Sequence, residues 1–103
     1  MLRAHFSFRK DHPCLADHFP DNPIAPGVLT LDHVSRCLLA QVAGMYVAGF
    51  PQVKFMRPVL PGVEVEVTYV KKSDSLYQFK CESRGDTLLL GQIRLAQEGK
   101  SLV

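Results

Sequence analysis

The chain has 103 residues, of which 47% are hydrophobic, a size that suits one domain spanning residues 1–103 rather than two. Twelve Lys and Arg residues against ten Asp and Glu residues leave a formal net charge of +2, which excludes a strongly basic nucleic-acid-binding protein. The three cysteines are odd in number and include no CxxC pair, which argues against a disulfide framework and a cysteine-based zinc site. Free thiols are typical of a reducing compartment, and we expect a cytoplasmic protein.

The first half of the chain predicts a strand, a stiff loop and a helix. Apolar and polar side chains alternate over residues 2–8, which indicates a strand with one buried face. Residues 10–27 are predicted to be loop, because four prolines there fix φ and lack a backbone donor. Residues 28–45 are predicted to be a helix that is apolar on most sides. Asp32, His33 and Arg36 within this stretch argue against a membrane span.

Four further strands are predicted over residues 52–60, 63–69, 76–83 and 87–96, separated by turn-forming residues at 61–62, 73–75 and 84–86. The order favours an α+β fold in which an antiparallel sheet of about five strands wraps around one helix. One such sheet cannot cover a helix that is apolar on most sides. We therefore predict a homodimer, in which a second copy completes the cover.

His18, Gly27 and Asp32 form a candidate acid–base set. His18 lies in the proline-rich loop, and Gly27 opens the helix, where unpaired N–H groups and the positive end of the dipole favour a developing negative oxygen. Asp32 follows about one turn into the helix among apolar residues, where a carboxylate needs a partner or a role. A histidine base, a helix-start N–H and a carboxylate can perform acid–base chemistry if the fold brings them together.

Two motifs resemble a known family. Residues 18–32 read HFPDNPIAPGVLTLD, which is similar to the motif His-Phe-Pro-x-x-Pro-x-x-Pro-Gly-Val-Leu of the β-hydroxyacyl-ACP dehydratases of bacterial fatty-acid synthesis. In that family Glu or Asp stands fourteen residues after the histidine, the separation of His18 and Asp32. Residues 55–62, FMRPVLPG, resemble the family's Phe-x-Arg-Pro-Val-x-Pro-Gly. The order of the predicted strands is also that of the family's hot-dog fold.

The resemblance implies a double hot dog with two active sites at the dimer interface, each combining His18 of one subunit with Asp32 of the other. The implied reaction converts a (3R)-hydroxyacyl thioester on acyl carrier protein to the trans-2-enoyl thioester. His18 would remove the C2 proton, the Gly27 N–H would polarise the thioester carbonyl, and Asp32 would assist departure of the C3 hydroxyl. No metal or redox cofactor is expected, because the thioester itself is the electron sink. The implied substrate-binding residues are Phe19, Pro26, Val28, Arg36, Phe55 and Arg57.

Arg36 stands where the family usually has Gln, and it leaves alternatives open. Residues at i and i+4 share a helix face, so Arg36 can pair with Asp32 and favour the ionised carboxylate. An ionised carboxylate suits activation of water, which would make the protein a hot-dog acyl-ACP or acyl-CoA thioesterase. A non-catalytic acyl-carrier-binding subunit is a third possibility. Val28 stands where the double-bond-isomerising branch has Cys, so we infer no isomerase activity.

The expected partner is acyl carrier protein, and a basic rim for it could come from Lys54, Arg57, Lys71 and Lys72. The homodimer could extend to a higher oligomer or pair with a related subunit. We expect no nucleic-acid partner and no membrane span. The sequence does not distinguish acyl-chain lengths, nor primary fatty-acid synthesis from a polyketide or aryl polyene pathway.

Overall fold

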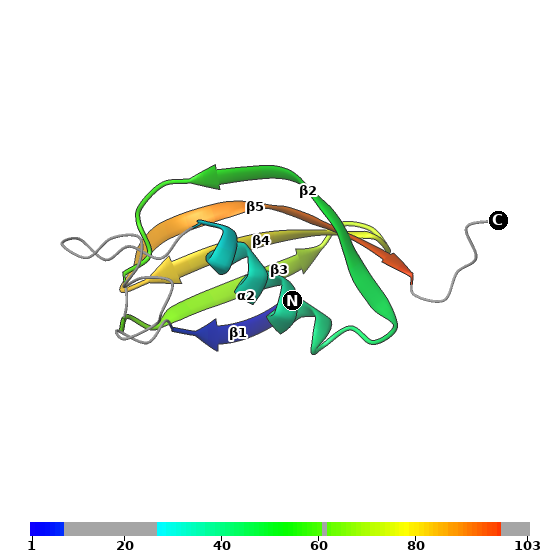
Figure 1. Cartoon of the computed structure of the whole chain (residues 1–103), viewed down its shortest axis with the longest axis horizontal. Helices are drawn as coiled ribbons and strands as arrows, with labels where there is room; N and C mark the ends of the chain where they lie inside the picture. The colour runs from blue at the N-terminus through cyan, green and yellow to red at the C-terminus, as the bar shows by residue number, and fades with distance from the viewer. Residues whose placement is uncertain (8–26, 61, 98–103) are drawn as a thin grey trace.

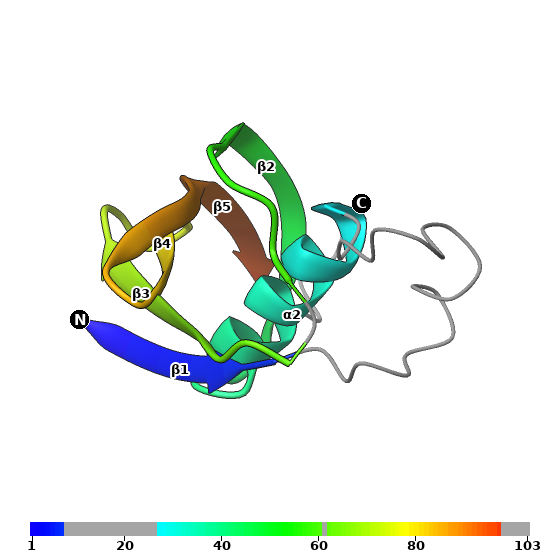
Figure 2. The same cartoon turned by 90° about the vertical axis from the view of Figure 1, so that its left-hand side faces the viewer.

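The computed structural model describes residues 1–7, 27–60 and 62–97 (Figure 1). Within them, five strands form one antiparallel sheet in the order β1-β3-β4-β5-β2. The sheet curves around the helix α2, which lies on its concave side (Figure 2). This confirms the predicted sheet of five strands with one helix. The elements in chain order are β1 (Leu2–Phe6), α2 (Gly27–Leu39), β2 (Met45–Phe55), β3 (Val65–Lys71), β4 (Leu76–Ser83) and β5 (Asp86–Gln97).

The core lies between the concave side of the sheet and one stripe of α2. Thr30, Val34 and Leu38 follow one another at a spacing of four along this stripe, and each is fully buried. Tyr69, on β3 between β1 and β4, is also fully buried, and its hydroxyl donates a hydrogen bond to the Val34 carbonyl at 2.6 Å. The buried hydroxyl is therefore satisfied, and it ties the helix to the sheet.

Among the described residues, the opposite side of α2 is left uncovered by the sheet, as expected for a single sheet wrapped around one helix. Asp32 and Arg36 are exposed on this side, and Leu31 and Leu39 are only partly buried. A five-stranded sheet curved over one side of a helix covers only that side. Within the described residues, no helix has the length and apolar character that a membrane span requires.

The boundary between the helix and β2 also differs from the prediction. The helix ends at Leu39 rather than at residue 45, and β2 begins at Met45 rather than at residue 52. Gly44 adopts φ 75°, a left-handed conformation that interrupts a helix. Met45 and Val47 then pair with Gln97 and Leu95 of β5. A short apolar run fits both helical and strand periods, and pairing with β5 decides between them.

The turn between β4 and β5 follows the predicted chemistry. The hairpin between β4 and β5 has Arg84 at φ 53° and Gly85 at φ 83°, and both positive values are what a type I′ turn requires.

The end of β2 differs from the prediction, because this strand ends at Phe55, five residues before the predicted end. The two N–H groups that follow, from Met56 and Arg57, both donate to the Leu88 carbonyl at 2.8 and 3.0 Å. The segment after β2 is thereby held beside β5.

Candidate functional site

A pocket of about 490 Å³ opens beside the first turn of α2, and we call it the helix-start pocket. Thr30 and Val59 are its buried lining residues, with 0% and 5% of their surfaces exposed. The other lining residues come from the helix start and from the end of β2 and the segment after it. They are Gly27, Phe55, Met56, Arg57 and Pro58. The pocket therefore joins a mostly apolar cavity to a helix N-terminus.

Gly27 lets this pocket stabilise negative charge. It is the first residue of α2, and the first four N–H groups of a helix have no partner within the helix. These groups and the positive end of the helix dipole can stabilise negative charge that develops on a nearby carbonyl oxygen. A thioester placed in the pocket could use them in this way.

Asp32 and Arg36 lie on another side of α2 and do not line the helix-start pocket. Asp32 comes five residues after Gly27, which at 3.6 residues per turn places it well around the helix from the glycine. Its Oδ2 lies 2.9 Å from Nε of Arg36, which confirms the predicted pairing of these two residues. The two side chains are 49% and 76% exposed, so the pair adds less than about 1 kcal/mol to stability.

The other predicted site residues divide into two groups. Phe55 and Arg57 line the helix-start pocket together with Gly27. Three predicted residues, His18, Phe19 and Pro26, lie outside the described residues, and Val28 is described only as part of α2.

Two outcomes concern residues beyond the predicted catalytic set. Thr30 was missed as a pocket residue, although its position three residues after Gly27 places both on one helix face. Of the predicted basic rim, Arg57 lines the pocket, whereas Lys71 pairs with Asp74 at 3.5 Å.

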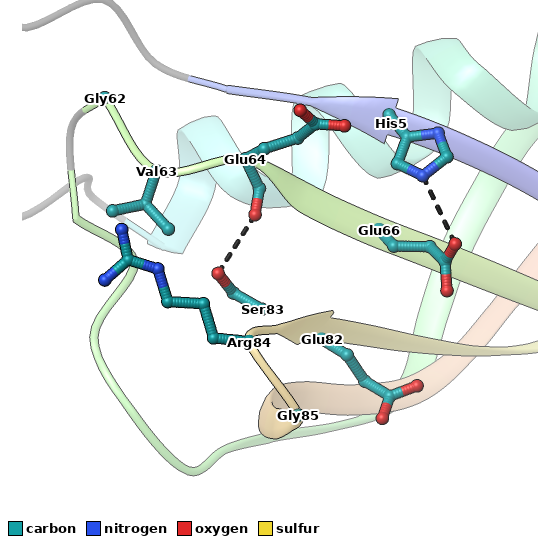
Figure 3. Close-up of a pocket in the computed structure, with 9 residues that line it drawn as sticks. All are labelled: His5, Gly62, Val63, Glu64, Glu66, Glu82, Ser83, Arg84 and Gly85. Carbon is teal, nitrogen blue, oxygen red and sulfur yellow. Dashed lines mark hydrogen bonds and ion pairs between the residues drawn. The ribbon is translucent and has the colours of Figure 1, made fainter.

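A larger pocket, about 590 Å³, lies at the end of the sheet where β1, β3 and β4 meet (Figure 3). His5 Nε2 faces Glu66 Oε2 at 3.2 Å, and the Ser83 hydroxyl donates to the Glu64 backbone carbonyl at 3.0 Å. Three glutamates, Glu64, Glu66 and Glu82, line this pocket. The described residues hold no group of three or more His, Cys, Asp or Glu side chains that could bind a metal ion. This pocket also contains none of the predicted site residues, so we place the candidate site at the helix start despite its smaller volume.

Two thiols lie near the core, and neither suits nucleophilic catalysis. Cys37 and Cys81 are free, as predicted, while Cys14 lies outside the described residues. Burial raises the pKa of Cys37, and burial together with the nearby Cys37 raises the pKa of Cys81 to about 12. The nucleophilic form of cysteine is the thiolate, so both groups stay in their unreactive form at neutral pH.

Comparisons with known proteins agree with the two sequence motifs. A family model described as ApeI-like, ApeI dehydratase, matches residues 1–92. The 3-hydroxyacyl-[acyl-carrier-protein] dehydratase FabZ of Haemophilus influenzae is 36% identical over 89 residues, which are 76% of this chain and 60% of that protein. The chain thus spans about three-fifths of the length of the curated relatives it matches.

Solved structures support the fold. The dehydratase heterocomplex ApeI:P from Xenorhabdus doucetiae matches with a TM-score of 0.78 at 24% identity, covering 92% of this chain and 86% of that chain. A mutant of the fluoroacetyl-CoA-specific thioesterase FlK matches with a TM-score of 0.68 at 14% identity, covering 94% and 90%. At these identities the likeness shows the fold alone. The family model, which covers most of the sequence, carries the assignment: the chain belongs to the ApeI-like dehydratase family.

Proposed function

We propose that the protein removes water from a (3R)-hydroxyacyl thioester on acyl carrier protein and forms the trans-2-enoyl thioester. The observation that carries this proposal is Gly27 at the start of α2, in the wall of a mostly apolar pocket, in a chain of the dehydratase family. The substrate class comes from relatives named 3-hydroxyacyl-[acyl-carrier-protein] dehydratase.

Each proposed residue has one role in the reaction. His18 takes the proton from C2, and the Gly27 N–H stabilises the negative charge that develops on the thioester oxygen. The C3–O bond breaks as the hydroxyl takes up a proton, delivered with the help of Asp32, and leaves as water, while the proton that His18 takes from C2 keeps the proton count in balance. The electron pair of the C2–H bond becomes the C2=C3 double bond. The thioester accepts charge during this step, so the mechanism needs no redox cofactor.

We propose that the active unit is a homodimer in which Asp32 of the partner subunit completes the site. Asp32 in its own chain does not line the helix-start pocket, and the side of α2 that carries it is open. β2 is an 11-residue strand at one edge of the described sheet, and a long edge strand favours pairing with another chain. Native mass spectrometry gives the assembly directly: a dimeric mass supports this arrangement, and an active monomer rejects it.

The central experiment is intact mass spectrometry of (3R)-hydroxyacyl carrier protein after incubation with the pure protein. We expect the carrier to lose the mass of one water. His18→Ala should abolish this loss, because it removes the proposed base. His5→Ala is the matched control, since His5 lies in the other pocket, and it should keep activity. Full activity in His18→Ala would reject the assignment.

A thioesterase is the second candidate, and the Arg36–Asp32 ion pair favours it. A carboxylate next to a cation can act as a base that activates water to attack the thioester carbonyl. The same mass measurement separates the reactions, because hydrolysis removes the whole acyl group and releases the carrier thiol. No release of thiol, or unchanged release by Arg36→Gln, would reject this alternative. Carrier binding without any turnover would instead identify a non-catalytic subunit.

A further inference from the structure

Phe55 contacts the first residue of α2 although 54% of its surface is exposed. A Cβ built on Gly27 would lie 2.9 Å from Cζ and 3.1 Å from Cε1 of Phe55. The nearest atom is the one farthest from the phenylalanine backbone, so the tip of the ring meets the glycine. A real Cβ does not approach another atom that closely, so with a side chain at position 27 the tip of the ring would have to move from its present place.

Backbone conformation does not account for the glycine at position 27. Among the described residues the glycines with positive φ are Gly44, Gly62 and Gly85, and Gly27 is not one of them. A residue with a Cβ could adopt the ordinary helical conformation there. The ring of Phe55 is what opposes a side chain at this position, so the two residues are matched in shape.

The backbone that carries the ring is fixed. Phe55 pairs with Leu89 of β5, and the next two N–H groups donate to the Leu88 carbonyl. The ring can therefore make room only by rotating about its side-chain bonds. Thr30 and Val59 close the buried part of the same pocket. An acyl group that reaches the helix start must fit between this buried part and the ring.

We propose that Phe55 determines substrate specificity by limiting the width of the acyl group next to the thioester, and that Gly27 lacks a side chain to admit the ring. The inference rests on the proposed function, because it refines the same site. Straight acyl chains would fit beside the ring, whereas a branch at C4 would press against it. One methylene group in an apolar pocket changes kcat/KM by about 10- to 200-fold, so a ring at this position can discriminate between such chains.

The test compares two carrier-free probes, the N-acetylcysteamine thioesters of (3R)-hydroxybutyrate and of (3R)-hydroxy-4-methylpentanoate. In Phe55→Ala we expect the ratio of kcat/KM for the branched probe over the straight probe to rise about tenfold or more. Val70→Ala is the control, since Val70 is an exposed apolar residue on β3 outside the helix-start pocket. It should leave the ratio unchanged.

A double variant tests the contact without relying on turnover. Gly27→Ala should change the Tm less favourably in the wild-type background than in Phe55→Ala, because its Cβ meets the ring only in the former. A folded Phe55→Ala with the wild-type ratio for the two probes overturns the inference and leaves the dehydratase assignment standing. Equal changes in Tm on Gly27→Ala with and without the ring also overturn it. No dehydration of either probe or of the carrier-bound substrate by the wild type overturns the proposed function, and this inference with it.

Discussion

Thr30 and Asp32 stand two residues apart on α2 and have opposite surroundings. Thr30 is fully buried beside the helix-start pocket, whereas the Asp32 side chain is 49% exposed and paired with Arg36. On the sheet-facing side the helix residues are closely packed against the sheet, whereas on the open side the side chains are charged and exposed. The difference indicates that substitutions on the sheet-facing side should cost stability, whereas those on the open side should cost activity.

Among substitutions on α2, Asp32→Asn should give the largest effect on activity. Removing the carboxylate should lower kcat/KM for dehydration by about 10²- to 10⁴-fold, the range of a positioned acid–base group. The Tm should change little, because the exposed ion pair with Arg36 adds little stability. Mass spectrometry of the carrier substrate and thermal unfolding measure the two quantities. Glu82→Gln, in the other pocket, is the control, and unchanged activity in Asp32→Asn would contradict the proposed role.

Leu38→Ala should give the largest loss of stability. Leu38 is fully buried between α2 and the sheet, and a leucine deletion at such a site costs about 2–5 kcal/mol. Arg36→Ala, two residues away on the open side, should cost less than about 1 kcal/mol. Urea unfolding of both variants gives the comparison. Equal losses would contradict the division of the helix into two sides.

Alkaline pH should lower the stability of the fold through the buried thiol of Cys81. The pKa of Cys81 rises from 9.0 to about 12 in the folded chain, chiefly through burial. Between these values the unfolded chain has released the proton and the folded chain has not, so stability is constant below about pH 9 and falls as pH rises toward 12. The slope is at most about 1.4 kcal/mol per pH unit for this group. Cys81→Ala should reduce the slope, and an unchanged slope would contradict the assignment to Cys81.

Tyr69→Phe should have the smallest effect of the four. It removes the hydroxyl that donates to the Val34 carbonyl at 2.6 Å and keeps the ring in the core. We expect a loss of about 0.5–1.5 kcal/mol in the free energy of unfolding, the usual net value of one hydrogen bond. Urea unfolding measures it. A gain in stability would show that the bond does not tie the helix to the sheet.

The sequence by itself determined the local features. Residues 76–83 were predicted to be a strand, and β4 has these bounds. The turn at Arg84 and Gly85 and the pairing of Arg36 with Asp32 were also predictable. Each depends on residues within a few positions of one another, so spacing and residue type are sufficient. The two motifs identified the family for the same reason, since a motif is a local pattern.

Only the tertiary structure decided which residues meet across the chain. Pairing with β5 set the start of β2 at Met45, where the apolar pattern alone fitted a helix. The contact of Phe55 with Gly27 joins residues far apart in sequence, and it depends on how β2 returns past the helix start. Burial of Thr30 likewise follows from the curvature of the sheet around α2. These features arise from packing between distant segments, which sequence periodicity does not specify.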